Sequence, residues 1–361
     1  MQDLDPATGL KAGTFGFGTY EHRGRRFPGL VQPDGALIDL SQRFRDTHEI
    51  LDDWESNLQI LMDVDAASRG SDLRFADVRA LPPLAHPNIL GGGSNYREHV
   101  IEMLTHGPYS KLRLQDGESL EAARARNAAF VDHRAQHGMP IFWSGMHSSL
   151  IGANDDIVLP PIGKNHDWEL ELVAVIGAPR RFASLEEAGA MIAGYMIIND
   201  LATLDQYQRP DVPWQYDMFI KNQPTFKVTG PFIVPSALVD RDAIRIELQV
   251  NGVVKHDWPV TDMIFSPEKM VAYASERARL MPGDMILTGS PPGNASLTGD
   301  FLKAGDLVTG SLTGLGRQRN LCIAETLEPG RTPVFGTYVA PAPEPAPPSP
   351  QRVRSKDGVG G

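Results

Sequence analysis

The chain of 361 residues has a single cysteine, Cys322, and therefore cannot form an internal disulfide. Disulfides persist mainly in oxidising compartments, so this composition favours a reducing one. Residues 1–5 are not a basic stretch followed by an apolar run, so no secretory signal is expected. No uninterrupted apolar run approaches the roughly 20 residues that span a bilayer. We therefore expect a cytoplasmic protein without a membrane partner.

Positive charge is also scarce. Lysine and arginine total 34 against 45 aspartate and glutamate residues, which gives a formal net charge of −11. This balance argues against a nucleic-acid partner, because polyanions are bound by basic surfaces. Hydrophobic residues make up 41% and charged residues 22%, as in an ordinary globular protein. The length suggests about two domains.

The most informative stretch is residues 167–177, which alternates as a β-strand does. This alternation places Glu169 and Glu171 on one face, and Leu170 and Leu172 on the other. An isolated Glu-x-Glu is usually a solvated strand edge. Two carboxylates beside apolar residues repel each other unless a cation lies between them, and their oxygens suit Mg²⁺, Mn²⁺ or Ca²⁺.

A second candidate lies in residues 89–102, where three glycines precede Asn95 and Tyr96. His99 and Glu102 are three residues apart, so a helical turn places them on one face. A histidine oriented by a carboxylate can act as a general base, although such pairs are also common surface contacts. The glycine run does not match a dinucleotide fingerprint, because no βαβ unit follows it.

Local signals predict further elements. Ser184 and Glu187 form a capping box for a helix to about residue 193, and Ser266-Pro267 begins a helix to about residue 279. The remaining expectations are a hairpin at Asp34-Gly35, helices over 46–62 and 119–137, a strand over 194–198 that leads to Asn199-Asp200, a hairpin at Asn251-Gly252, and a strand from Met285 that ends in an anion-binding loop. The polar segment 104–138 is interpreted as a lid or a surface insertion.

These motifs together resemble the fumarylacetoacetate hydrolase family over residues 85–325. The resemblance rests on motifs in the family's order: 95–99, Ser148-Ser149-Leu150, Glu169-Leu170-Glu171, Asn199-Asp200, Lys221 with Thr225-Phe226 and Gly230-Pro231, Pro282-Gly283-Asp284, 288–293 and 301–306. It implies an α+β, β-rich fold, with a twisted mixed β-sheet roll and a small N-terminal α+β domain. We expect an N-terminal domain over 1–82, a catalytic domain over 83–330, and a disordered Pro/Ala-rich tail over 331–361.

The resemblance also implies roles for individual residues. Glu169, Glu171 and Asp200 would hold one Mg²⁺ or Mn²⁺, with Ca²⁺ as a further possibility. His99 would activate water with Glu102 as its partner, and Lys221 would face the substrate. The residues expected to contact the substrate are Tyr96, Tyr207, Thr288 and Ser290. The family further implies a homodimer and a small dicarbonyl or 2-oxo acid substrate.

Three positions depart from the family pattern. Leu204 stands where many members have arginine, Tyr207 where many have glutamine, and Gly145 where a lysine is frequent. Leucine in place of arginine removes a bidentate clamp for a carboxylate. We therefore expect a substrate that is less acidic or more aromatic than a typical acylpyruvate.

The predicted function is hydrolysis of a C–C bond in a β-dicarbonyl or acylpyruvate-type compound, through a metal-stabilised enolate. This activity would suit the catabolism of aromatic compounds. The same site would serve a decarboxylase, hydratase or isomerase of a 2-oxo acid. A non-catalytic protein that binds a small molecule is a third interpretation, since a shared fold does not establish a shared function.

Overall fold

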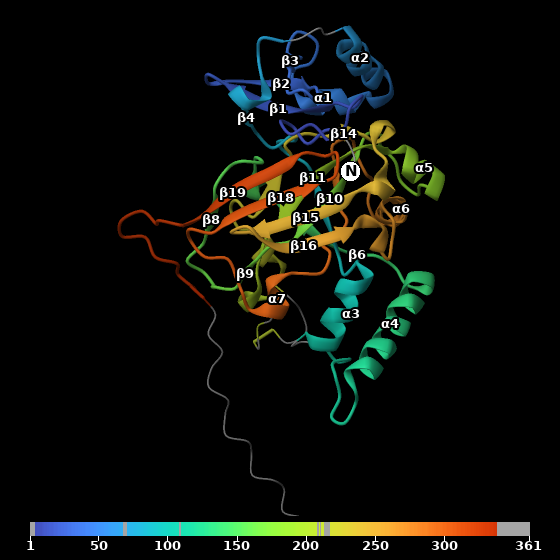
Figure 1. Cartoon of the computed structure of the whole chain (residues 1–361), viewed down its shortest axis with the longest axis vertical. Helices are drawn as coiled ribbons and strands as arrows, with labels where there is room; N and C mark the ends of the chain where they lie inside the picture. Colours follow the sequence, from blue (N-terminus) through green and yellow to red (C-terminus); the bar gives the residue numbers. More distant parts are fainter. Residues whose placement is uncertain are drawn as a thin grey trace, which may run out of the picture.

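A computed structural model describes residues 4–337, except for 68–70, 108–109, 208, 210 and 213–216. The N-terminal part forms a four-stranded sheet in the order β3-β2-β1-β4, with two helices beside it (Figure 1). The bounds are β1 (Gly16–His22), β2 (Arg25–Val31), β3 (Leu37–Asp39), α1 (Thr47–Asp52), α2 (Trp54–Ala67) and β4 (Arg79–Ala80). The helical structure predicted over 46–62 is confirmed, but it is divided at Asp53, because α1 ends at Asp52 and α2 begins at Trp54.

The site is built on an eight-stranded mixed sheet. Its order is β6-β5-β17-β10-β11-β13-β7, and β14 pairs with β11. The bounds are β5 (Ile89–Gly93), β6 (Ile141–Gly145), β7 (Leu150–Ile151), β10 (Leu170–Ile176), β11 (Ile192–Asp200), β13 (Lys227–Thr229), β14 (Val234–Pro235) and β17 (Met285–Leu287). Its β17–β5 and β13–β7 pairs are parallel, whereas β10 and β11 are antiparallel neighbours at its centre.

A five-stranded sheet in the order β16-β15-β18-β19-β8 packs near the central sheet (Figure 1). Its strands are β8 (Ile157–Leu159), β15 (Arg245–Val250), β16 (Val253–Pro259), β18 (Leu307–Leu312) and β19 (Arg317–Ala324). A short pair joins β9 (His166–Asp167) to β12 (Ala202–Thr203). The predicted α+β, strand-rich fold with a twisted mixed sheet is confirmed.

Five further helices surround the sheets. They are α3 (Arg97–His106), α4 (Leu120–His137), α5 (Leu185–Ala190), α6 (Pro267–Arg277) and α7 (Ala295–Thr298). The capping box at Ser184 and the proline start at Pro267 are confirmed, although both helices end two to three residues earlier than predicted. Figure 1 shows α3 and α4 side by side, away from the N-terminal sheet. None of the described helices is long and apolar enough to cross a membrane.

The apolar side chains of β10 separate into two clusters. Leu170, Leu172 and Ala174 join one cluster, whereas Val173 and Val175 join the other. The second cluster also contains Phe17 from β1, so the N-terminal sheet packs against the central one. The boundaries expected at residues 82 and 330 stay predictions. Residues 331–337 are irregular, and the rest of the predicted tail lies outside the described residues.

Candidate active site

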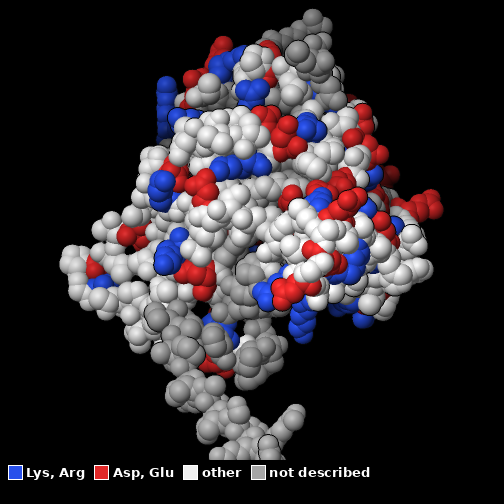
Figure 2. All heavy atoms as spheres, turned by 60° about the horizontal axis from the view of Figure 1, so that its bottom comes forward, with Lys and Arg blue, Asp and Glu red and all other residues white. Residues whose placement is uncertain are grey.

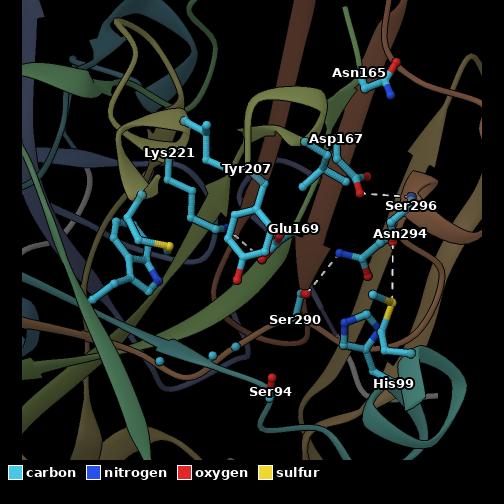
Figure 3. Close-up of a pocket in the computed structure, with 18 of the residues that line it drawn as sticks. Ser94, His99, Asn165, Asp167, Glu169, Tyr207, Lys221, Ser290, Asn294 and Ser296 are labelled. Atoms are coloured by element: carbon cyan, nitrogen blue, oxygen red, sulfur yellow. Dashed lines mark hydrogen bonds and ion pairs between the residues drawn. The ribbon is translucent and has the colours of Figure 1, made fainter. Parts of the chain in front are cut away.

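A cavity of about 320 Å³ opens beside the N-terminal end of β10 (Figure 3). Its walls come from the sheet, from α3, from the loop after β17, and from the irregular segment that follows β12. Its lining includes five of the ten residues predicted for the site. These five are His99, Glu169, Tyr207, Lys221 and Ser290.

Three carboxylates converge at this end of the sheet. Glu169 precedes β10, Glu171 lies within it, and Asp200 ends the antiparallel neighbour β11. The backbone N–H of Asp200 donates to the Glu169 carbonyl at 2.8 Å, and the Asn199 side chain accepts from the Glu169 N–H at 2.9 Å. One ligand atom from each carboxylate lies within 4.8 Å of the others. Oxygen donors at this spacing fit a hard divalent cation.

Burial makes these charges costly. It raises the pKa of Glu171 well above its usual range, and Asp200 and Glu169 raise it further. It also raises the pKa of Glu169. The Lys221 ammonium donates to Asp200 at 2.8 Å and lies 2.9 Å from a Glu169 oxygen. Burial alone would lower the pKa of Lys221, but Asp200 and Glu169 raise it above its ordinary value.

A second lysine, which the sequence analysis missed, neutralises the other Asp200 oxygen. Lys227 is fully buried, and its ammonium donates to Asp200 Oδ1 at 2.7 Å and to the Lys221 carbonyl at 2.6 Å. Burial lowers its pKa. The two residues are direct cross-strand partners, because Asp200 in β11 pairs with Lys227 in β13. A lysine between the apolar residues Phe226 and Val228 was the available sequence signal.

His99 enters the pocket from α3. Burial lowers its pKa to about 4, so its imidazole is neutral at pH 7. Its Nδ1 is buried and has no hydrogen-bond partner among the described residues. Glu102 follows one turn along the same helix, as predicted, and burial raises its pKa. However, no hydrogen bond joins Glu102 to His99 within the described part of the chain.

Two predicted substrate contacts lie elsewhere in this structure. Tyr96 and Thr288 are both fully buried and do not line the pocket. Thr288 instead donates its hydroxyl to the Leu172 carbonyl at 2.8 Å. The following loop was expected to bind a substrate anion, but the Gly289 N–H donates to Glu171 at 2.7 Å. These groups therefore support Glu171 and the strand that carries it.

Asp167 is a further pocket residue that the sequence analysis did not single out as a site residue. Its carboxylate accepts hydrogen bonds from the Ala295 and Ser296 backbone N–H groups at 2.7 and 3.1 Å. Burial raises its pKa to about 7. Its place two residues before Glu169, on the same side of the alternating stretch, was the signal for its position. It ties the start of α7 to the glutamate-bearing segment.

Comparison with known proteins identifies relatives across most of the chain. The sequence model of the fumarylacetoacetate (FAA) hydrolase C-terminal domain matches residues 88–322. A 2,4-didehydro-3-deoxy-L-rhamnonate hydrolase from Sphingomonas sp. (strain SKA58) is 29% identical over 313 residues, which are 84% of this chain and 94% of the relative. The human mitochondrial oxaloacetate tautomerase FAHD2A is 34% identical over 196 residues, which are 52% of this chain and 62% of the relative.

Solved structures show the same fold. Fumarylacetoacetate hydrolase from psychrophilic Exiguobacterium antarcticum aligns with a TM-score of 0.67 and 24% identity, over 86% of this chain and 100% of its own. Maleylpyruvate hydrolase from Sphingobium sp. SYK-6, in complex with manganese(II) and pyruvate, aligns with a TM-score of 0.65 and 21% identity. That alignment also covers 86% of this chain and 100% of the neighbour.

Proposed function

Because the chain belongs to the fumarylacetoacetate hydrolase family, we propose that it is a divalent-metal-dependent hydrolase of a β-dicarbonyl or acylpyruvate-type compound. The observation that carries this proposal is the convergence of Glu169, Glu171 and Asp200 beside a pocket that His99 also lines. Three carboxylates and the ammonium groups of Lys221 and Lys227 leave one negative charge when all are ionised. A divalent cation would reverse that sign and favour an anionic substrate.

The donor set fits Mg²⁺ or Mn²⁺, because all three ligands are carboxylate oxygens. The manganese in the maleylpyruvate hydrolase neighbour supports the same choice. When bound, such an ion supplies Lewis-acid polarisation of the substrate carbonyls and stabilises an enolate. Lys221 and Lys227 each contact one oxygen of Asp200, whereas Glu169 lines the pocket directly.

The remaining steps belong to side chains of the pocket. The neutral His99 imidazole would accept a proton from water, whose oxygen adds to the distal carbonyl of the substrate. The adjacent C–C bond then breaks, and its electron pair forms the enolate of the 2-oxo acid. Protonation of this enolate completes the reaction. Lys221 lies in the pocket wall, where its ammonium can donate to the developing oxyanion.

This proposal is tested by isotope incorporation. Purified protein is incubated with an acylpyruvate and Mn²⁺ in H₂¹⁸O, and the products are analysed by mass spectrometry. Hydrolysis would give equal amounts of pyruvate and a carboxylic acid, with one ¹⁸O in the new carboxylate. Chelation of the metal should stop the reaction, and added Mn²⁺ should restore it. Uncleaved substrate under all these conditions would rule out the hydrolase.

The second candidate is a keto–enol tautomerase or isomerase. Relatives named oxaloacetate tautomerase, 33–34% identical over about half of this chain, support it. The absence of a described hydrogen bond between His99 and Glu102 also suits a reaction that moves a proton without activating water. Loss of the enol absorbance of oxaloacetate, together with deuterium exchange at C3 and no cleavage, would identify this activity.

A further inference from the structure

We propose that the substrate's acyl group is uncharged and apolar, with an aromatic ring as its best fit, and that its only anionic group lies at the carboxylate cluster. This inference rests on the proposed function, because it names the substrate class of the same site. It is carried by the scarcity of cations among the described lining residues, where Lys221 is already held by Glu169 and Asp200, and by the apolar side chains of the same lining. The polar lining residues Ser94, Asn165, Ser290, Asn294 and Ser296 carry no charge.

The described lining has three charged side chains besides the neutral His99, namely Asp167, Glu169 and Lys221. Glu169 and Lys221 lie close together in Figure 3, with the Tyr207 ring beside them and Asp167 further along the wall. The Lys221 ammonium already contacts Glu169 at 2.9 Å and Asp200 at 2.8 Å. It can therefore serve an oxyanion next to these carboxylates. It cannot also reach a carboxylate at the far end of an acylpyruvate.

Apolar and aromatic side chains reach the pocket from several elements. They are Met103, Trp143, Leu204, Tyr207, Met218, Ile220 and Phe301. Three of them are aromatic and come from separate segments, so a flat ring would find faces and edges to contact. A ring of benzoyl size fits the cavity of about 320 Å³. Ligand pockets usually bury most of the surface of their ligand, so such a ring would be largely enclosed.

Positive charge is scarce along the described lining of the pocket. Among the described residues that line the pocket, Lys221 is the only lysine or arginine. Arg209 is close in sequence to Tyr207, but its guanidinium donates to Asp211 at 2.6 Å and lies 3.7 Å from an Asp217 oxygen. A second carboxylate would therefore lose its hydration without gaining a bidentate partner.

The test uses pairs of ligands that differ only by one carboxylate. N-Phenyloxamate and N-(4-carboxyphenyl)oxamate both carry a chelating 2-oxo acid end and cannot be cleaved at a C–C bond. Their dissociation constants are measured by calorimetry on the Mn²⁺-loaded protein. The matched substrates, 4-phenyl-2,4-dioxobutanoate and its 4-carboxyphenyl analogue, are compared by kcat/KM. We expect a preference for the uncharged ring of about 100-fold, because an unpaired charge is costly to bury.

The second part of the experiment uses variants that should weaken the preference for the uncharged ring. Leu204→Arg should improve the ratio toward the carboxylated ligand at least tenfold, whereas the conservative control Leu204→Met should keep the wild-type ratio. Circular dichroism establishes that each variant is folded, and Tyr207→Arg replaces Leu204→Arg if the latter is not. A folded arginine variant with an unchanged ratio would count against the inference.

The outcomes separate the inference from the proposed function. Preferential binding of phenyloxamate with no cleavage of either dioxobutanoate would support the apolar substrate class and reject the hydrolase. Equal or tighter binding of the carboxylated oxamate would overturn the inference, even if both substrates are cleaved. Failure of both oxamates to bind at millimolar concentration would also overturn it, because the metal-proximal end would then not dock as proposed.

Discussion

Asp200 shares its carboxylate between two buried lysines. Lys221 contacts Oδ2 from the pocket side, and Lys227 contacts Oδ1 from the sheet. A buried carboxylate without such partners would take up a proton instead of keeping its charge. Glu171 lacks a lysine contact among its described hydrogen bonds, and it accepts the Gly289 N–H. The cluster therefore contains one carboxylate, Asp200, neutralised by two lysines, and one, Glu171, without a described lysine contact.

This asymmetry predicts the effect of Glu171→Gln. The amide oxygen keeps an acceptor for the Gly289 N–H but removes a negative charge from the proposed cation site. We expect the Mn²⁺ dissociation constant, measured by electron paramagnetic resonance, to increase at least tenfold, while the melting temperature of the metal-free protein falls little or rises. Glu247→Gln, at an exposed position of β15, is the control. Equal Mn²⁺ affinity in wild type and Glu171→Gln would exclude Glu171 as a ligand.

The pH dependence of activity should reflect the burial of His99. A general base works in its neutral form, and burial lowers the pKa of His99 to about 4. Activity that requires neutral His99 should thus persist below pH 6.5 and fall only as pH approaches 4. The kcat/KM profile of the metal-saturated protein checks this, with His99→Gln as the variant that should lose activity throughout. An acid limb centred near pH 6.5 would mean that the imidazole is solvated during catalysis.

At the scale of elements, the approach of the Lys227 side chain from β13 toward β6 and β5 explains one departure from the family pattern. A Cβ on Gly145 would lie 2.9 Å from Lys227 Cε and 2.7 Å from Ile89 Cγ2. The Lys227 side chain therefore uses the space that glycine leaves, and its ammonium lies 4.4 Å from the centre of the Trp143 ring. A lysine side chain therefore reaches this place from β13, whereas the lysine that is frequent in the family at position 145 would extend from β6.

Gly145→Ala should consequently be destabilising. We expect a loss of about 1–3 kcal/mol in the free energy of unfolding, because a Cβ added at these close contacts forces neighbours to shift. Urea denaturation gives this value. Gly93→Ala in the adjacent strand β5 is the matched control, since its added Cβ would have only Ile141 Cγ2 within 4 Å, at an ordinary 3.6 Å. Equal losses in the two variants would show that the Lys227 contact has no special cost.

Helices α3 and α4 form a two-helix unit that carries His99. Arg97 donates to Asp132 at 2.7 Å across the pair, and the buried Asn127 donates to Thr105 at 3.0 Å. Both helices lie at the edge of the molecule in Figure 1, and Figure 2 shows acidic and basic side chains interspersed on the face seen from that end. Val100, Ile101 and Val131 of the pair also belong to the apolar cluster that contains Leu170 and Leu172 of β10. Movement of this unit relative to the sheet would therefore be a local opening of that packing.

We expect this unit to act as the predicted lid. Amides of residues 97–106 and 120–137 should exchange with deuterium faster than those of β10 and β11 in the free protein. Binding of Mn²⁺ and phenyloxamate should slow their exchange, because closure would bring His99 against the ligand. Peptides from α6, which is outside the pocket lining, provide the internal control. Unchanged exchange in α3 and α4 at saturation would contradict a lid.

Sequence periodicity predicted the elements better than their contacts. Alternation in residues 170–176 identified β10 and its two faces, and Ser184 and Ser266 marked helix starts correctly. The Asp200–Lys227 pair was missed because it depends on the register of β11 with β13, which local pattern does not specify. The Gly289 contact was assigned to a substrate for the same reason, since only the pairing of β17 with β10 brings it to Glu171.

At the scale of the molecule, the central sheet carries the carboxylate cluster and also packs against the N-terminal sheet. Phe17 donates its N–H to the Ile233 carbonyl and stacks on Trp54, with ring centroids 5.5 Å apart. The cluster that includes Phe17 also includes Val173 and Val175, which belong to the strand carrying Glu171. A change in the stability of β10 should therefore reach the N-terminal sheet.

This continuity predicts that metal binding stabilises the whole described fold. A ligand present at 100 times its dissociation constant adds about 2.7 kcal/mol to the free energy of unfolding. For a chain of this size we expect a rise in melting temperature of roughly 3–5 °C with Mn²⁺. Hydrogen exchange should slow in β1 and β2 as well as in β10, because the slowest amides open only when the shared cluster unfolds.

Two controls separate this effect from general electrostatics. The formal net charge of −11 attracts divalent cations over the whole surface, so NaCl at matched ionic strength measures the screening contribution. Glu171→Gln should keep the screening contribution and lose the specific rise. Two melting steps, of which Mn²⁺ shifts only the later one, would show that the N-terminal sheet unfolds independently of the site. A single step that moves with Mn²⁺ in the wild type and not in Glu171→Gln would show that the carboxylate cluster and the shared core act as one cooperative unit.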